Sequence, residues 1–105
     1  MSPANDIIEK CKTALKSHYG SQFKGLVLYG SMARGQAGLA SDIDLLVLLS
    51  SPFDYFDELH GIINLLYPLQ LESERLLSVK PTFINDYERG SIQLYRNAQK
   101  EGILV

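Results

Sequence analysis

Twenty residues near the middle of the chain, residues 30–49, constrain its fold more than any other stretch. They read GSMARGQAGLASDIDLLVLL and join a Gly-Ser pair to two aspartates and an unbroken apolar run. The run Leu45–Leu49 is apolar at every position, which is typical of a strand buried on both faces in the middle of a sheet. The segment KGLVLY before it, residues 24–29, is rich in branched and aromatic residues and stops abruptly at Gly30. The sequence therefore predicts two buried strands joined by a loop.

Asp42 and Asp44 stand at the start of the second of these strands. Because strand side chains alternate, both carboxylates leave the same face, about 6–7 Å apart at Cα, while Ile43 points into the core. Two like charges this close are costly unless a cation or a raised pKa relieves them. Mg²⁺, which binds carboxylate and phosphate oxygens, is a suitable cation. As an alternative, the two aspartates are turn and capping acids before a buried strand.

Gly30 and Ser31 form the predicted turn after the first strand. Gly30 has no Cβ, so its backbone can turn sharply or approach a ligand, and Ser31 offers a hydroxyl and an N–H at the same place. If residues 32–34 begin a helical turn, its unpaired N–H groups suit a phosphate. Arg34 either grips phosphate oxygens with its guanidinium or is a solvated loop arginine. A phosphate site beside a metal site is the layout for phosphoryl or nucleotidyl transfer.

These residues carry a resemblance to a known family. Gly30-Ser31, ten intervening residues and then Asp42-Ile43-Asp44 resemble the GS-x10-DxD signature of the DNA polymerase β-like nucleotidyltransferase superfamily. Further features look like its minimal nucleotidyltransferase branch: the short length, the Ala33-Arg34-Gly35 loop, Ser41, and the tail Leu94-Tyr95-Arg96-Asn97…Glu101-Gly102. Members of that branch are commonly paired with a HEPN-domain protein in prokaryotic toxin–antitoxin systems.

The resemblance implies both a fold and a function. The fold would be α+β, of the polymerase β palm type: a small mixed β-sheet with helices packed on one face and the active site at the other. The function would be Mg²⁺-dependent transfer of a nucleoside monophosphate, AMP from ATP, to a hydroxyl of a HEPN-type toxin or of a small molecule. Asp42 and Asp44 would be catalytic and hold the metal, and Gly30, Ser31 and Arg34 would bind the nucleotide. The alternative is an antitoxin-like binding module of weak or no activity that neutralises or assembles with a HEPN-domain partner.

The family pattern is incomplete at one position. The superfamily usually adds a third carboxylate on the strand that follows the next helix, and here the expected position falls on Ser78. Serine does not take a proton from a hydroxyl at neutral pH as a carboxylate does, and a missing base costs about 10²–10⁴ in rate. Glu72 or Glu74 could substitute, although each also reads as a solvated turn charge. Lys80 either meets a phosphate or is an exposed strand lysine.

Helical segments are predicted on both sides of the central stretch. Ser2 and Pro3 suit the cap and first position of a helix that Gly20 ends. Residues 54–67 are predicted to form a second helix ended by Pro68, with one apolar face made of Phe56, Leu59, Ile63 and Leu66.

The remainder of the chain is predicted to supply one strand and one further helix. Residues 75–82 read as a third strand, in which Pro81 indicates a sheet edge or a strand end. Residues 86–90 read as a polar connection and residues 91–100 as the final helix. The apolar tail, residues 103–105, is expected to dock on the sheet or on a partner.

Length, charge and cysteine content narrow the setting. A chain of 105 residues supports one domain, residues 1–105, and its net charge of −2 argues against binding long nucleic acids. No apolar run approaches the roughly 20 residues that span a membrane, and no signal-peptide pattern is present. The single cysteine, Cys11, fits a reducing cytoplasm. So small a domain is expected to need a partner or a homo-oligomer to complete its site.

Overall fold

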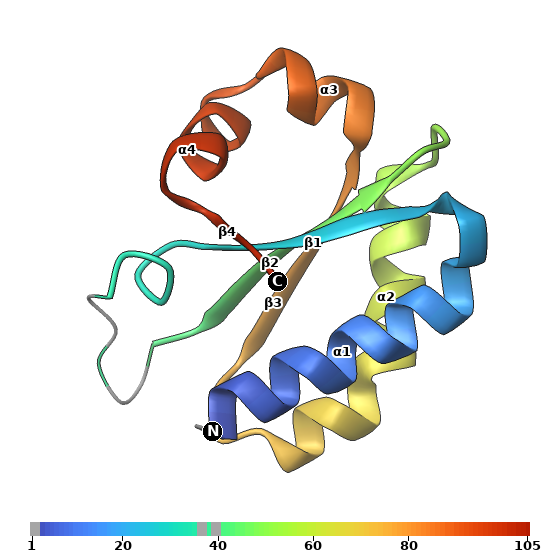
Figure 1. Cartoon of the computed structure of the whole chain (residues 1–105). Helices are drawn as coiled ribbons and strands as arrows, with labels where there is room; N and C mark the ends of the chain where they lie inside the picture. The colour runs from blue at the N-terminus through green and yellow to red at the C-terminus, as the bar shows by residue number, and fades with distance from the viewer. Residues whose placement is uncertain (1–2, 36–37, 39–40) are drawn as a thin grey trace.

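A computed structural model describes residues 3–35, 38 and 41–105; Ser2, the predicted helix cap, lies outside them. In chain order the elements are α1 (Pro3–Tyr19), a short 3₁₀ turn η1 (Gly20–Gln22), β1 (Phe23–Tyr29), β2 (Ile43–Leu49), α2 (Tyr55–Glu72), β3 (Leu77–Phe83), α3 (Ile84–Arg89), α4 (Gln93–Glu101) and β4 (Ile103–Leu104) (Figure 1). No helix of this described part is long and apolar enough to cross a membrane.

The strands form one mixed sheet in the order β3-β2-β1-β4. β1 runs antiparallel to β2 and to β4, whereas β2 and β3 are parallel. The apolar residues of β2 are all buried, as expected of a strand with a neighbour on each side. The predicted α+β fold with a small mixed sheet is therefore confirmed. The C-terminal tail docks on the sheet as β4, and the N–H of Val105 donates to the Leu26 carbonyl oxygen at 2.9 Å.

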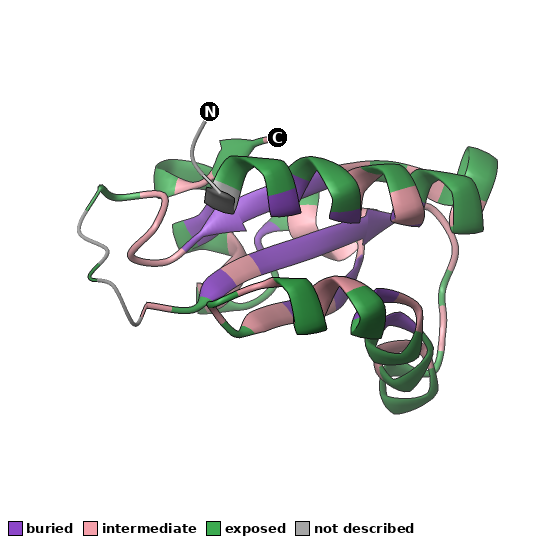
Figure 2. Cartoon of the chain, turned by 90° about the horizontal axis from the view of Figure 1, so that it is seen from below, coloured by how far each residue is buried: buried purple, intermediate pink, exposed green. Residues whose placement is uncertain are grey.

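The two faces of the sheet carry different layers. The long helices α1 and α2 cover one face, where alternate strand residues and the inner sides of both helices form the main core (Figures 1 and 2). The other alternate residues of β1 and β2 point to the opposite face and pack with α4 in a smaller cluster: Val27, Tyr29, Leu46, Leu48 and Ala98. Asp44 shares this second face, because it alternates with the buried Leu45 of the main core. The predicted layer of helices on one face is present, and the opposite face carries a second, shorter layer made of α3 and α4.

The prediction for α2 was wrong in its end and in its buried face. Pro68 lies inside the helix, which continues to Glu72. The last turn is retained because the Gln70 side chain donates to the Arg75 carbonyl at 3.0 Å and accepts from the Leu77 N–H at 2.7 Å. These bonds fasten the end of the helix to the start of β3.

The core side of α2 is formed by Ile62 and Leu66, which are buried, with Leu65 and Leu69 packed beside them. Phe56 is 73% exposed and Ile63 is 52% exposed, so two of the four residues predicted for the apolar face point outward. The helix is apolar on more than one side, and helical periodicity could not choose between the stripes.

β3 is an edge strand, which confirms the reading of Pro81. The predicted polar connection is wrong, because most of it belongs to α3. This helix has six residues and ends at Gly90, whose φ is +63°. So short a helix has too few turns to show an apolar period, and only the glycine at its end signals it.

Candidate functional site

The candidate site begins where β1 ends against β2. Gly30 follows β1 with φ +77°, a conformation that L side chains rarely adopt, and a Cβ added there would overlap Oδ2 of Asp44. Tyr29 is the Cα partner of Asp44 in the β1–β2 ladder, which brings the turn to this point. Glycine is therefore required both for the turn and for the close approach of the Asp44 carboxylate to the backbone.

The loop after Gly30 closes on itself in a single turn. The Arg34 N–H donates to the Gly30 carbonyl at 3.2 Å and the Gly35 N–H to the Met32 carbonyl at 3.4 Å. Ser31 lies at the start of this turn, where the first N–H groups have no partner within the turn itself. The predicted helical turn is present, and residues 31–35 form a turn rather than a regular helix.

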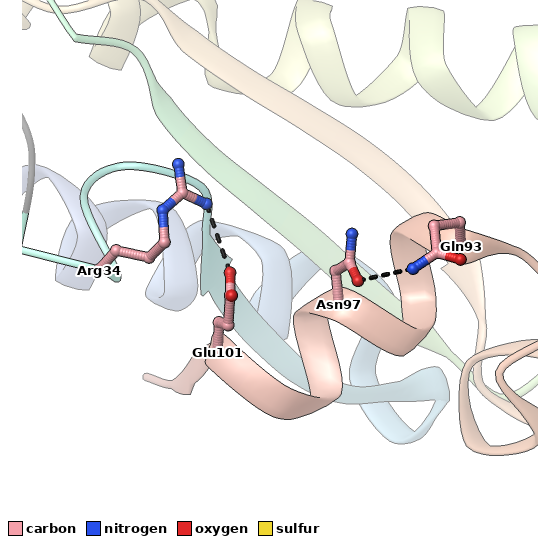
Figure 3. A network of polar contacts seen from close by, with 4 residues as sticks. All are labelled: Arg34, Gln93, Asn97 and Glu101. Carbon is pink, nitrogen blue, oxygen red and sulfur yellow. Dashed lines mark hydrogen bonds and ion pairs between the residues drawn. The ribbon is translucent and has the colours of Figure 1, made fainter.

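Arg34 belongs to this turn, and its side chain extends to Glu101 at the end of α4. Its side chain is exposed, and Nη1 lies 3.4 Å from Oε2 of Glu101 (Figure 3). Its positive charge also acts on the carboxyl group of Asp44, whose pKa it lowers in part. Arg34 therefore stands at the margin of the site, within electrostatic reach of Asp44.

The two aspartates differ in their surroundings. Asp42 is exposed, whereas Asp44 is partly buried. Burial, and then the nearby charge of Asp42, raise the pKa of Asp44, while Lys80 and Arg34 act in the opposite direction. The repulsion predicted from the Asp-Ile-Asp spacing therefore has a physical effect, which a bound cation would relieve.

An arginine that the sequence did not single out holds the segment before these aspartates. Nη1 of Arg75 donates to the carbonyls of Gly38 and Ser41, at 2.8 and 2.9 Å. Oγ of Ser41 in turn accepts from the Gly38 N–H at 2.9 Å. Arg75, in the connection between α2 and β3, thus holds Gly38 and Ser41, which precede Asp42. No local sequence signal identifies this contact, because it spans more than thirty residues.

β3 supplies the far side of the site. Ser78 is the Cα partner of Asp44 in the parallel ladder, so the two side chains leave the same face. Glu72 pairs instead with Lys10 of α1, at 2.9 Å, and Glu74 is exposed in the turn before β3. The described residues contain no group of three or more His, Cys, Asp or Glu that could hold a metal ion. Asp42 and Asp44 still suit Mg²⁺, since that ion binds through one or two carboxylates together with substrate phosphates.

Lys80 and Tyr29 complete the site. Lys80 is half-buried and donates from Nζ to the Tyr29 hydroxyl at 3.1 Å, with Nζ 5.8 Å from the centroid of the ring. Burial alone would lower the pKa of Lys80, but the hydrogen bond to Tyr29 and the surrounding charges raise it. The reading of Lys80 as an exposed strand lysine is therefore wrong. The sequence contains a signal for this position. Lys80 follows Ser78 by two residues, and alternate residues of a strand point to the same face, so Lys80 shares the face of the predicted site.

Comparisons with known proteins identify the family of the chain. The model of the nucleotidyltransferase domain family matches residues 8–105. Three proteins of Methanocaldococcus jannaschii are similar in sequence, each bearing the name "Putative protein adenylyltransferase". MJ0604 is 33% identical over 90% of this chain and 90% of its own length, MJ0128 is 33% identical over 89% and 91%, and MJ1215 is 34% identical over 62% and 80%.

A solved structure shares the fold. It is the crystal structure of a mutant of the toxin–antitoxin MntA–HpeT; the match has a TM-score of 0.60 at 18% identity and covers all of this chain and 72% of the other. This likeness shows the fold, and the family model that matches residues 8–105 shows the family. The chain therefore belongs to the nucleotidyltransferase domain family.

Proposed function

We propose that the protein transfers AMP from ATP to a hydroxyl group of a protein partner, with Mg²⁺ as the metal. Enzymes of this family generally use a nucleoside triphosphate and a divalent metal ion. The names of the M. jannaschii relatives support adenylyl as the transferred group and a protein as the acceptor. The observation that carries the proposal is the close approach of the Asp44 carboxylate to Gly30, where an added Cβ would overlap Oδ2. It supports the proposal because a turn with N–H groups suited to a phosphate then lies beside a carboxylate suited to a metal ion.

In this proposal each part of the site has a separate task. Gly30, Ser31 and the turn that follows bind the β- and γ-phosphates, and Arg34 reaches them from the margin. Asp42 and Asp44 hold Mg²⁺, which when bound neutralises charge on the α-phosphate and on the departing pyrophosphate. The acceptor oxygen bonds to the α-phosphorus, the bond from that phosphorus to the bridging oxygen breaks, and pyrophosphate leaves. The hydroxyl proton passes to water, because Ser78 offers no base.

The acceptor we propose is a HEPN-type toxin. The fold neighbour comes from a toxin–antitoxin complex, which supports a toxin as the partner. A small-molecule hydroxyl or a second copy of this chain is the alternative.

We place the activity in the cytoplasm, in keeping with the single cysteine, Cys11, whose burial raises its pKa to about 11 and leaves the thiol unreactive.

Two labels distinguish this reaction from phosphoryl transfer. The protein, co-purified with any partner that it retains, is incubated with Mg²⁺ and ATP labelled either at the α- or at the γ-phosphate. Label from the α position should appear on the partner, and label from the γ position should not. The Asp42→Asn/Asp44→Asn variant, prepared with the same partner, should transfer neither. Transfer of γ label, or equal α transfer by the double variant, would contradict the proposal.

A second function is favoured by the serine opposite Asp44. Without a carboxylate at position 78, the protein could act as a binding module that occludes its partner and transfers nothing or very little. The cost of keeping Asp42 and Asp44 beside each other speaks against this reading. If the protein is such a binding module, the Asp42→Asn/Asp44→Asn variant should neutralise the partner as well as the native chain does, with no need of ATP.

A further inference from the structure

Lys80 is a half-buried cation that forms no ion pair within the part of the chain that the structure describes. Its Nζ donates to the Tyr29 hydroxyl, and Asp44 acts on it only as a nearby charge. Placing a charge in such a position costs free energy unless something pairs with it. A packing role would be filled as well by an uncharged side chain of the same length, so the charge itself needs an explanation.

The Lys80–Tyr29 pair has hydrogen-bond donors left to offer. The lysine ammonium carries three N–H groups, and one of them is used on Oη of Tyr29. Because Oη accepts in that bond, the tyrosine O–H remains able to donate elsewhere. The two side chains can therefore present both ammonium and hydroxyl donors to one anion, and charge-assisted bonds of this kind are the strong ones.

The sheet order places this pair at the carboxylates. Asp44 lies on β2, with the Gly30–Ser31 turn on the β1 side and Ser78 and Lys80 on the β3 side. Lys80 follows Ser78 by two residues, so both share the face of Asp44. A carboxylate at position 78 would lie about 6–7 Å from Lys80 along the strand and would compensate its charge. With serine there, the charge of Lys80 is available to a ligand.

We propose that Lys80, with the Tyr29 hydroxyl, binds the transferred α-phosphate of the nucleotide from the β3 side. This inference rests on the proposed function, since it assigns one more ligand of the same nucleotide. The lysine then supplies fixed positive charge on the side of the site where the superfamily's usual third carboxylate is missing. Charge placed in advance at a reacting phosphate is an effective form of catalysis.

The test compares ATP binding by the native chain with binding by Lys80→Met, Lys80→Arg and the control Lys24→Met. Methionine keeps the apolar stem and removes the charge, and Lys24 is an exposed lysine of β1. Titration calorimetry is run with ATP in the presence of a chelator and again with Mg²⁺. Lys80→Met should lose about tenfold or more in affinity for metal-free ATP, because a charge-assisted bond to the phosphate is removed. Lys24→Met should match the native chain, and Lys80→Arg should retain most of the affinity.

Phosphorus NMR of bound ATP locates the contact. Replacing Lys80 by methionine should move the α-phosphorus resonance more than the γ-phosphorus resonance. Equal affinities for the native chain and Lys80→Met, or a change confined to the γ-phosphorus, would overturn the inference even if Asp42→Asn/Asp44→Asn abolishes Mg²⁺-dependent binding as the proposed function requires.

A failure of the proposed function gives a different pattern. In that case the native chain would show no Mg²⁺-dependent ATP binding, and pyrophosphate would become the probe for Lys80. Loss of metal-free pyrophosphate binding in Lys80→Met alone would retain Lys80 as an anion-binding residue and remove its assignment to the α-phosphate. No pyrophosphate binding by the native chain would overturn both proposals.

Discussion

Gly30 is the residue on which the geometry of the site depends most directly. Gly30→Ala forces an L side chain into φ +77° and places a Cβ on the Asp44 carboxylate. A strained backbone of this kind costs about 1–3 kcal/mol, and the overlap adds to it. We therefore expect a lower free energy of unfolding, measured by urea denaturation, and weaker nucleotide binding.

Gly20→Ala is the matched control for this substitution. Gly20 has φ +57°, but a Cβ there meets nothing within 4 Å. Its cost should therefore be that of the backbone alone. If Gly30→Ala were no more destabilising than Gly20→Ala, the close approach of Asp44 to the turn would be wrong.

Asp44 should give the stability of the protein a defined dependence on pH. Burial and the charge of Asp42 raise its pKa above the ordinary value of 3.8, so the folded state holds a proton that the unfolded state has released. Stability is then lost as pH rises from about 3.8 through the folded pKa. Asp44→Asn should match the native chain in acid and become the more stable of the two toward neutral pH.

This dependence is measured by thermal unfolding of both proteins between pH 3 and 7. Glu74→Gln, which removes an exposed carboxylate in the turn before β3, serves as the control for the loss of one acid. A difference between Asp44→Asn and the native chain that shrank as pH rose would have the opposite sign and would refute the account of Asp44.

At the level of elements, adjacent isoleucines on α2 test which side of the helix faces the core. Ile62 is 1% exposed and Ile63 is 52% exposed. Ile62→Ala should cost about 2–5 kcal/mol, because it removes buried methyl groups and leaves a cavity. Ile63→Ala should cost less than about 1 kcal/mol. Urea denaturation of the two variants measures this, and equal costs would show that the helix is rotated from its described position.

Pro68 lies in the interior of α2 and removes one N–H from the helical ladder. Such a proline costs about 3 kcal/mol in a helix, offset by about 1 kcal/mol from the stiffer unfolded chain. Pro68→Ala should thus raise the free energy of unfolding by roughly 1–2 kcal/mol. Pro52→Ala, outside any helix, should not raise it. A destabilised Pro68→Ala variant would mean that the proline ring itself makes packing contacts that outweigh the missing hydrogen bond.

Some elements and contacts could be predicted from the sequence, and others could not. β1, β2 and the turn at Gly30 were predictable because short apolar runs that stop abruptly, at Gly30 after β1 and at Ser50 after β2, are typical of buried strands. The buried side of α2 was not, since Phe56 and Ile63 continue the apolar pattern onto its outer surface. The contacts of Arg75 and Lys80 were missed for a different reason: both depend on β3 lying beside β2, and local patterns do not fix strand order.

At the scale of the whole molecule, the fold concentrates its polar chemistry on one face of the sheet. The main core is formed with α1 and α2 on the other face. It holds in place the strands that carry Asp44, Ser78 and Lys80, and Gly30 directly follows β1. The candidate site draws on residues of β1, β2 and β3, so the Gly-Ser and Asp-Ile-Asp motif identifies only part of it.

The most direct test of the account is the binding of ATP measured by calorimetry with and without Mg²⁺. The native protein should bind ATP more tightly with Mg²⁺, and Asp42→Asn/Asp44→Asn should lose this dependence on the metal because it has lost both carboxylates. The double variant should remain folded and at least as heat-stable as the native chain, since its charge repulsion is gone. Mg²⁺-dependent binding that survives in the double variant, or no binding by the native protein, would contradict a nucleotide site built on these two aspartates.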